Sequence, residues 1–456
     1  MNPYQYRVEN RISDLFIYRQ ERRLPENLSV ITAGRILALR SYRSIIFFDL
    51  YEDGQFIQCA IRNQLAPEAF QYFQDNISRG NIVWIDGEFG TTQTGEVTVF
   101  VNNIQLINRN IDLIGDLHDG FNHATGRQLR ELDIMLNPTS MQRFRQRSQI
   151  IWSIRNYFNQ RDFMEVETPI LQSVASGAQA TPFVTHFNAH NRDSYLRIAP
   201  ETYLVRLLIG GMSRIFELGH NFRNEGLSPR HNPEFSMLEF YETFSNMEAT
   251  IELTQNVIQD AIQNIGLNLN SITYGDYSLD FTNFQRYTIG ESLIHFLNYS
   301  EEQINNQTFL CSILQENNIN NTMPSNNVEW LQYLIFEELV EPLLIQPTFI
   351  TDLPVEASPL AYSDNNRTTV RFELFSSGRE IANGFQQVLD YQEQVERFNF
   401  QSQINGRDSA MEADNDYMNA VRYGIPTVSG CGIGIDRLIM LLTNTENIRD
   451  IILYPV

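Results

Sequence analysis

The sequence contains no lysine, so all 33 of its basic side chains are arginine. Lysine is among the commonest residues of ordinary proteins, and selection or design against it explains its absence better than chance does. Aspartate and glutamate together number 55, which gives a formal net charge of -22. Because an acidic surface repels a polyanion, any contact with nucleic acid must come from local groups of arginines.

Other absences narrow the class of protein. Nowhere do about 18 apolar residues follow one another, which excludes a membrane-spanning helix, and the start of the chain lacks the apolar stretch of a signal peptide. The three cysteines, Cys59, Cys311 and Cys431, are too few and too far apart for a disulfide framework or a zinc site. We therefore expect a reducing compartment, the cytoplasm, and no membrane. No GxxxxGK[ST] sequence is present, so a P-loop enzyme is excluded as well.

The length of 456 residues predicts two or three domains. Residues 28–108 alternate apolar and polar side chains in five runs, with the turn sequence Glu52-Asp53-Gly54 between the second and third. Five short strands in about 80 residues predict a closed β-barrel of the OB type, a common nucleic-acid-binding fold. With a helix expected over residues 9–23, this domain is predicted to span residues 1–110.

The remainder reads as a polar connector over residues 111–140 and a large domain over residues 141–456. Apolar side chains recur at helical spacing from Gln142 onward. Residues 245–345 are mostly helical in pattern and rich in Asn and Gln, which indicates an insertion. Strands are expected again near 347–352 and 368–375, and an apolar helix over 435–443.

The densest chemical signal is a strand–loop–strand pattern over residues 214–241, whose loop holds Arg223, Glu225, Arg230 and His231. Guanidinium groups bind phosphate oxygens in a bidentate way and stay charged at every relevant pH. Several of them on one loop suit a polyphosphate ligand. Taken alone, however, an arginine-rich hairpin is more often a solvated surface.

Two further blocks lie toward the end of the chain. Glu373 and Glu380 lie seven positions apart, with strand-like residues after each. Paired carboxylates can hold Mg²⁺ against phosphate oxygens, although two glutamates at this spacing are common by chance. The run Gly432-Ile-Gly434-Ile-Asp436-Arg437 is a glycine-rich turn before an apolar helix. Its glycines allow a close approach of the backbone to a ligand, but a GxG turn alone is weak evidence.

Together the three blocks resemble the class II aminoacyl-tRNA synthetases, and the lysyl-tRNA synthetase subgroup in particular. Residues 163–170 look like the first motif of that class, residues 223–241 like the second and residues 432–437 like the third. The run from Arg230 to Phe235, Arg-His-Asn-Pro-Glu-Phe, is similar to the lysyl form. The resemblance covers nearly the whole chain.

This resemblance implies an α+β fold, in which a mostly antiparallel sheet with flanking helices follows the barrel. It also implies ATP-dependent activation of lysine, its transfer to the 3′ end of tRNA, and a homodimer formed through the first motif. By the same analogy Arg223, Arg437, Glu373 and Glu380 are catalytic, and the two glutamates hold Mg²⁺. The ATP-binding residues are then Arg223, Glu225, Arg230, His231, Phe235, Glu373 and Arg437.

The amino-acid pocket of the family matches Gly177, Glu201, Glu239, Tyr241, Asn383, Phe385 and Gln387. The family has glutamate where this chain has Gln387, and Thr181 stands where the family usually has arginine. Removing one partner of a buried charge costs about 3–5 kcal/mol. Three hypotheses therefore stay open: lysine as the substrate, the same adenylation of a different amino acid, or a catalytically weak regulatory paralogue.

In the barrel, the family's anticodon-reading positions match Arg40, Phe47 and Gln58. An aromatic ring that stacks on a base, beside amide and guanidinium groups that contact base edges, is the usual way in which proteins bind single-stranded RNA. For Phe47 alone, packing in the barrel core is an equally good interpretation. The presence of such a barrel argues against the paralogues that modify a protein, because those lack it.

Overall fold

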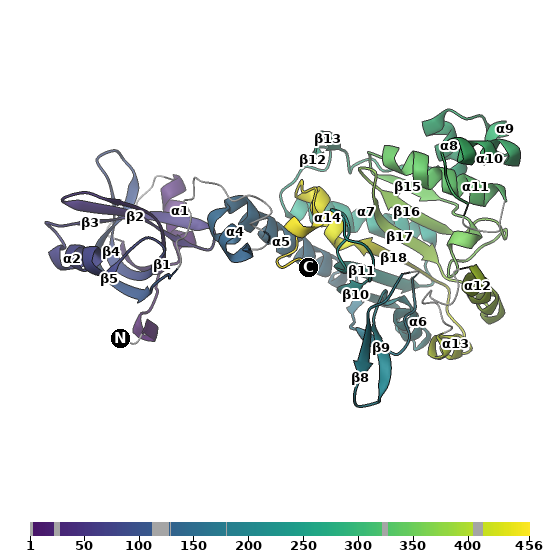
Figure 1. Ribbon diagram of the computed structural model, residues 1–456, viewed down its shortest axis with the longest axis horizontal. Coiled ribbons are helices and arrows are strands. Elements are labelled where there is room, and N and C mark those ends of the chain that lie inside the picture. Colours follow the sequence, from purple (N-terminus) through teal and green to yellow (C-terminus); the bar gives the residue numbers. More distant parts are fainter. Residues whose placement is uncertain are drawn as a thin grey trace. The chain divides into compact units, whose positions relative to one another are not determined.

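A computed structural model describes residues 3–21, 28–111, 127, 129–178, 180–321, 327–404 and 414–456. The chain divides into two compact units, Met1–Phe144 and Arg145–Val456 (Figure 1). Within the described ranges no helix combines the length and the apolar character that crossing a membrane requires.

The first unit is built on a closed barrel, as the sequence predicts. Its strands are β1 (Ser29–Ser41), β2 (Ile45–Glu52), β3 (Gln55–Arg62), β4 (Ile82–Thr91) and β5 (Val97–Asn108), and they close in the order β1-β2-β3-β5-β4. The alternation in β2 points Ile46, Phe48 and Leu50 into the core. Asp53 and Gly54 both have positive φ, which the tight turn between β2 and β3 requires.

Helices complete this unit. A 3₁₀ turn, η1 (Pro3–Gln5), precedes α1 (Ile12–Glu21), and α2 (Pro67–Asn76) lies between β3 and β4 and buries Phe70 and Phe73 against the barrel. The predicted connector contains α4 (Arg130–Leu136) and the start of α5 (Pro138–Asn159), so its described end is helical. Residues 112–126 and 128 of that connector lie outside the described residues.

The second unit contains an eight-stranded sheet of order β14-β15-β16-β17-β18-β11-β10-β6. The outermost pair at each edge is parallel and the other pairs are antiparallel, which confirms the mostly antiparallel sheet. The strands are β6 (Met164–Glu165), β10 (Arg214–Phe222), β11 (Glu234–Thr243), β14 (Gln285–Thr288), β15 (Thr348–Thr351), β16 (Arg371–Phe375), β17 (Glu380–Gln386) and β18 (Val428–Gly434).

Two small sheets accompany it. One has the order β7-β9-β8, with β7 (Leu171–Gln172), β8 (Val184–Phe187) and β9 (Arg192–Leu196). The other is the hairpin of β12 (Ile272–Tyr274) and β13 (Tyr277–Leu279). The flanking helices are α6 (Glu201–Ile209), α7 (Met247–Asn264), α12 (Tyr391–Ile404), α13 (Asn415–Val421) and α14 (Ile435–Leu442), with 3₁₀ turns η4 (Val355–Ala357) and η5 (Ile448–Asp450).

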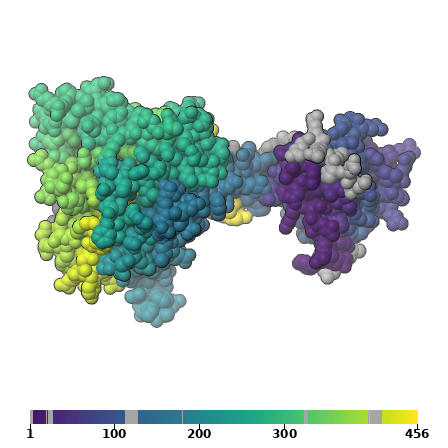
Figure 2. All heavy atoms as spheres, turned by 180° about the vertical axis from the view of Figure 1, so that it is seen from behind, coloured from purple at the N-terminus to yellow at the C-terminus, as the bar shows by residue number. Residues whose placement is uncertain are grey.

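The region expected as a helical insertion has two parts. Helix α7 packs on β16, β17 and β18, and its apolar side chains belong to the core beneath the main sheet. The later helices, α8 (Ile289–Leu297), α9 (Glu301–Ile304), α10 (Gln307–Glu316) and α11 (Val328–Ile335), share a separate apolar cluster with the π-helix η2 (Phe336–Val340), which leads into the 3₁₀ turn η3 (Glu341–Leu343). This green segment forms the upper surface of the unit in Figure 2.

Candidate active site

The strand register of the main sheet brings the predicted site residues to neighbouring positions. A row of directly opposed residues runs across five strands: Glu217, Glu239, Gly432, Asn383 and Glu373. Because directly opposed residues of neighbouring strands share a face, and residues two apart do too, the adjacent row of Tyr241, Gly430, Phe385 and Arg371 lies on that face as well. Residues from distant parts of the sequence therefore converge on one surface.

Two glycines of β18 keep that surface open. A Cβ atom added to Gly430 would lie 2.2 Å from Cδ1 of Tyr241, and one added to Gly432 would lie 2.5 Å from Cε of Met237. Only glycine therefore leaves room for these neighbouring side chains on the same face.

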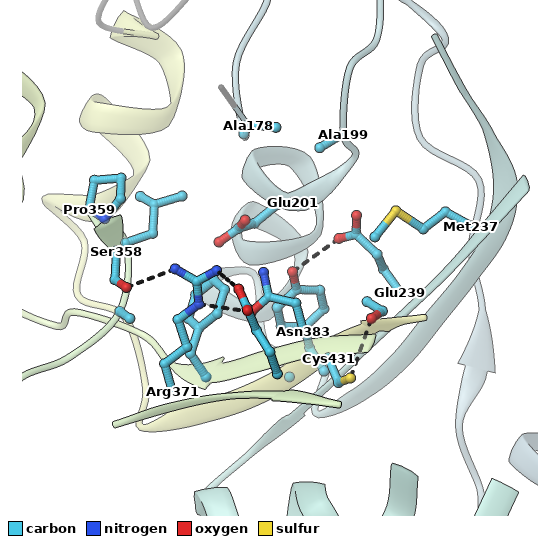
Figure 3. A pocket seen from close by; sticks show the side chains of 18 of the residues that line it. Ala178, Ala199, Glu201, Met237, Glu239, Ser358, Pro359, Arg371, Asn383 and Cys431 are labelled. Carbon is cyan, nitrogen blue, oxygen red and sulfur yellow. Dashed lines mark hydrogen bonds and ion pairs between the residues drawn. The ribbon is translucent and has the colours of Figure 1, made fainter. Parts of the chain in front are cut away.

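A cavity of about 320 Å³ opens above this face (Figure 3). Six of the seven residues predicted for the amino-acid pocket line it: Gly177, Glu201, Glu239, Tyr241, Asn383 and Phe385. Its far wall is formed by residues 357–361, including Ser358 and Pro359. Gly177 has φ +90°, a conformation in which a side chain would be strained.

Two buried carboxylates give this cavity its charge. Burial, together with the charge of Glu239, raises the pKa of Glu201 to about 8. Burial raises the pKa of Glu239 to about 7, although Tyr241 donates a hydrogen bond to its Oε2 at 3.0 Å. Within the described ranges neither carboxylate forms an ion pair. A cationic ligand would supply the partner that both carboxylates need in order to be ionised at neutral pH.

Gln387, the seventh predicted residue, is not among the residues that line the cavity. Its side chain is buried, and its Nε2 donates a hydrogen bond to Oε1 of Glu201 at 2.7 Å. Its Oε1 is buried with no hydrogen-bond partner in the described structure. A buried acceptor without a donor costs about 1–3 kcal/mol, so this oxygen has the capacity to accept from a ligand or a water molecule.

A second cavity of about 170 Å³ is lined by six of the seven residues predicted for ATP: Arg223, Glu225, Arg230, His231, Phe235 and Arg437. The seventh, Glu373, lines the first cavity. Arg223, Met237, Glu380 and Gly432 line both cavities, which therefore adjoin. The guanidinium carbon of Arg223 lies 5.2 Å from the centre of the Phe235 ring. This arrangement offers a charged lining next to an aromatic face, which suits a nucleotide.

Local contacts hold the charged side chains of the second cavity. Nη1 of Arg437, in the first turn of α14, donates to the carbonyl oxygen of Glu380 at 2.8 Å and to its Oε2 at 3.2 Å. Nδ1 of His231 lies 2.8 Å from Oγ of Ser228. Burial, and then the charge of Arg437, lower the pKa of His231. A neutral imidazole at neutral pH follows, so the permanent positive charge here comes from arginine.

The junction of the two cavities carries the predicted metal-binding pair, since Glu373 lines the first cavity and Glu380 lines both. Burial raises the pKa of Glu373 to about 7, and Arg371 opposes that rise. Among the described residues no group of three or more His, Cys, Asp or Glu side chains could enclose a metal ion. Mg²⁺ is usually held by one or two carboxylates together with substrate phosphates and water, so this pair fits Mg²⁺ bound with a nucleotide.

Sequence reasoning missed several supporting residues. Asp436 accepts hydrogen bonds from the backbone N–H of Ser236 at 2.7 Å and from Nη1 of Arg147 at 2.5 Å, which fastens α5, β11 and α14 together. Its neighbour Arg437 was predicted, and the place of Asp436 in the same glycine-rich run was the available signal. Thr181, which the sequence singled out because the family usually has arginine there, accepts a hydrogen bond at its backbone carbonyl oxygen from the backbone N–H of Asn224 at 2.7 Å.

The barrel brings its three predicted residues together. Arg40 lies opposite Phe47 in the β1–β2 register, with its guanidinium carbon 6.0 Å from the ring centre. Its Nη2 donates to Oε1 of Gln58 at 3.2 Å, and Nε2 of Gln58 donates to Oγ1 of Thr98 at 2.7 Å. The Phe47 ring is only half-buried, so it is not part of the barrel core.

Both units of the chain match known protein families. Residues 122–456 match the family of class II tRNA synthetases (D, K and N), and residues 30–107 match the OB-fold nucleic acid binding domain. The chain is 40% identical over 439 residues to the lysine--tRNA ligase of Neisseria meningitidis serogroup B, covering 94% of this chain and 87% of that relative.

Two further relatives carry the same name. The lysine--tRNA ligase of Magnetococcus marinus is 38% identical over 437 residues, covering 94% of this chain and 87% of its own length. That of Vesicomyosocius okutanii subsp. Calyptogena okutanii is 38% identical over 465 residues, covering 98% of this chain and 91% of its own. With a family match over most of its length and relatives that align almost from end to end, the chain belongs to the class II tRNA synthetases (D, K and N).

Proposed function

We propose that this chain activates lysine with ATP and transfers it to the 3′ end of the lysine-accepting tRNA. The observation that carries the proposal is the pair of adjoining cavities, one lined by buried carboxylates and the other by arginines, with Arg223 and Glu380 in both linings. A diamino acid and a polyphosphate are the ligands whose charges complement these linings. The names of the relatives, all lysine--tRNA ligases, point to the same substrate.

At the amino-acid end, Glu201 and the backbone of Gly177 receive the α-ammonium group. Glu239, Tyr241 and the free Oε1 of Gln387 serve the side-chain ammonium, and Asn383 and Phe385 complete the pocket. Two carboxylates that lack a cation of their own support this assignment, because lysine brings two ammonium groups into the cavity.

At the nucleotide end, Arg223 contacts the α-phosphate, and Arg230 and His231 reach the outer phosphates. The adenine ring lies between Phe235 and Arg437, with Glu225 at its edge. The support is that all six residues line one cavity. Mg²⁺, held by Glu373 and Glu380, would supply positive charge to the phosphates as the reaction proceeds.

In the first step, an oxygen of the lysine carboxylate attacks the α-phosphorus of ATP, the bond to the β-phosphate oxygen breaks, and pyrophosphate leaves. The carboxylate is already ionised, so no general base is needed. Arg223 neutralises charge on the α-phosphate, and the remaining contribution is positioning. In the second step, a ribose hydroxyl of the tRNA terminus attacks the adenylate carbonyl, which gives the ester, AMP and a proton.

For the tRNA, we propose that Phe47 stacks on an anticodon base while Arg40 and Gln58 contact base edges. The half-buried ring beside two polar side chains supports this. We further propose a homodimer through residues 163–170, where Met164 and Ile170 are 56% and 46% exposed. Three free cysteines, two of them buried, fit a protein that works in the reducing cytoplasm.

An amino-acid-dependent exchange between ATP and pyrophosphate, run separately with each of the twenty amino acids, tests the proposal. Exchange with lysine alone, followed by charging of tRNA, is the expected result. Exchange with another amino acid would reassign the pocket. No exchange with any of them would mean that the chain keeps the scaffold without the activity.

A further inference from the structure

One side chain in the first cavity has no role in the function proposed above. Arg371 begins β16, and its guanidinium group is almost enclosed, with 12% of the side chain exposed. Nη2 donates to Oε1 of Glu373 at 2.5 Å, and Nε donates to Oδ1 of Asn383 at 3.0 Å. Nη1 donates to the carbonyl oxygen of Ala357 at 2.7 Å and to Oγ of Ser358 at 2.8 Å.

These four acceptors belong to three different parts of the site, and Figure 3 shows Arg371 with two of the residues, Ser358 and Asn383. Glu373 is one of the two carboxylates that fit a metal ion, and Asn383 lines the amino-acid cavity from the neighbouring strand. Ala357 and Ser358 belong to the loop that forms the far wall of the same cavity. One planar group therefore touches the metal end, the amino-acid end and the wall at once.

The chemistry of arginine makes this connection rigid. A guanidinium group carries five N–H donors in one fixed plane, so partners on three sides constrain one another through it. A lysine ammonium is a compact charge that can reach only part of such a set. The geometry of the site thus depends on the shape of Arg371 in addition to its charge.

We propose that Arg371 is a positioning residue that sets Glu373 for the metal and Asn383 for the amino acid at the same time. It acts through these two side chains and through the fixed wall at residues 357–361. The inference rests on the proposed function, since it assumes that a metal–nucleotide complex and an amino acid occupy the adjoining cavities. Its consequence is that the affinities for the metal ion and for the amino acid fall together when the guanidinium group of Arg371 is lost.

A matched control exists on the same loop. Arg397 of α12 donates to the carbonyl oxygens of Ala361 and Ser358 and pairs with Glu393. Its side chain is 10% exposed, close to the value for Arg371. It holds the same wall from another side, and its recorded hydrogen bonds do not involve Glu373 or Asn383. A variant of Arg397 therefore weakens the wall alone, whereas a variant of Arg371 also displaces the metal-binding carboxylate of Glu373.

The test compares Arg371→Lys with Arg397→Lys in the full chain. Mn²⁺ binding in the presence of a non-hydrolysable ATP analogue is measured by electron paramagnetic resonance, lysine binding without ATP by calorimetry, and unfolding by a thermal scan. Loss of a partner that orients a metal ligand typically weakens metal binding about 10- to 100-fold. We expect a loss in that range for Mn²⁺ with Arg371→Lys, and a loss of lysine affinity of about tenfold alongside it. Arg397→Lys should lower the melting temperature and leave the affinity for Mn²⁺ unchanged.

A purely structural role gives a different pattern, in which both variants melt earlier and both keep their affinity for Mn²⁺. That result overturns the proposal. Should Arg371→Lys not fold, Ser358→Ala replaces it in the test. That variant removes one hydrogen-bond acceptor of Arg371, so the guanidinium group can rotate away from Glu373 and Asn383. We then expect Mn²⁺ binding to weaken by less than the roughly tenfold minimum that is typical for loss of a whole orienting partner, and an unchanged affinity counts against the proposal. If the wild-type chain itself fails to bind lysine, it is the proposed function that has failed.

Discussion

The two adjoining cavities differ in how their charge is held. The nucleotide side carries arginines whose charge does not depend on pH, Arg223 and Arg230 on the loop between β10 and β11 and Arg437 on α14. The amino-acid side carries Glu201 and Glu239, buried on strand and helix, with raised pKa values. The first site is therefore prepared for its ligand in advance, whereas the second gains its full charge only when a cation arrives.

The largest expected effect is on the amino-acid side. Glu201→Gln removes one partner of a buried ammonium group, which costs about 3–5 kcal/mol, or roughly 150- to 5000-fold in lysine affinity. Calorimetry with lysine measures it, and the affinity for ATP should stay the same. Glu242→Gln, on strand β11 and paired with Arg214 outside both cavities, is the control. A change of less than tenfold for Glu201→Gln would place the ammonium group elsewhere.

On the nucleotide side, Arg223→Met should slow ATP–pyrophosphate exchange by about 10²- to 10³-fold, the usual cost of losing one preorganised donor to a developing charge. Lysine affinity measured without ATP should change little, since the carboxylates remain. Arg230→Met, at an exposed position farther along the loop, should slow the exchange less than Arg223→Met does. Equal losses for the two variants would contradict a special role for Arg223 at the α-phosphate.

A smaller effect is expected for Gln387→Glu. The new carboxylate would lie against Glu201, where Nε2 of Gln387 now donates at 2.7 Å, and the pair would repel unless a proton or a cation joined them. Lysine should therefore bind about tenfold more tightly at pH 8.5 and gain less at pH 6.5. Gln386→Glu, on the opposite face of β17, is the control. Unchanged or weaker lysine binding at both pH values would show that the ammonium group does not reach this residue.

The pH dependence of the wild-type chain should separate the two sides further. With a pKa of about 8, Glu201 is mostly protonated in the empty cavity at pH 6.5, and binding of a cation must expel that proton. Lysine affinity should then rise by up to about tenfold per pH unit toward pH 8 and level off above it. Calorimetry in buffers of different ionisation enthalpy counts the released proton. ATP affinity should not follow this profile, and a flat lysine profile would mean that Glu201 is ionised before the ligand enters.

The comparison also explains what the sequence could predict. The loop with Arg223 and His231, and the turn before Arg437, are short contiguous motifs, and the structure brings all of them to one cavity. The barrel was predicted correctly, because alternation and turn residues are local signals. The mostly antiparallel sheet was also correct, but it was implied by the resemblance to the family. Helix α2 was missed, although Pro67 at its start and the spacing of Phe70 and Phe73 were visible.

The contacts within the site that the sequence did not predict depend on strand register and on residues far apart in the chain. Gln387 and Glu201 are 186 positions apart, and no local pattern indicates that one hydrogen-bonds to the other. Arg371 was not predicted as a site residue, because its partners in the 357–358 loop and on β17 meet only in the folded sheet. A period of two predicts which residues share a face, but not which strands lie side by side.

All of the cationic side chains that line the cavities are arginines: Arg223, Arg230, Arg371 and Arg437. A guanidinium group holds its proton throughout the working pH range, so it stabilises phosphate without offering a free electron pair. An acyl adenylate waiting for tRNA is reactive toward primary amines, and a chain without lysine has no side-chain amine to intercept it. Peptide mapping after many turnovers without tRNA should accordingly find amide-linked lysine only at the α-amino terminus, and an amide-linked lysine on any internal peptide would contradict this.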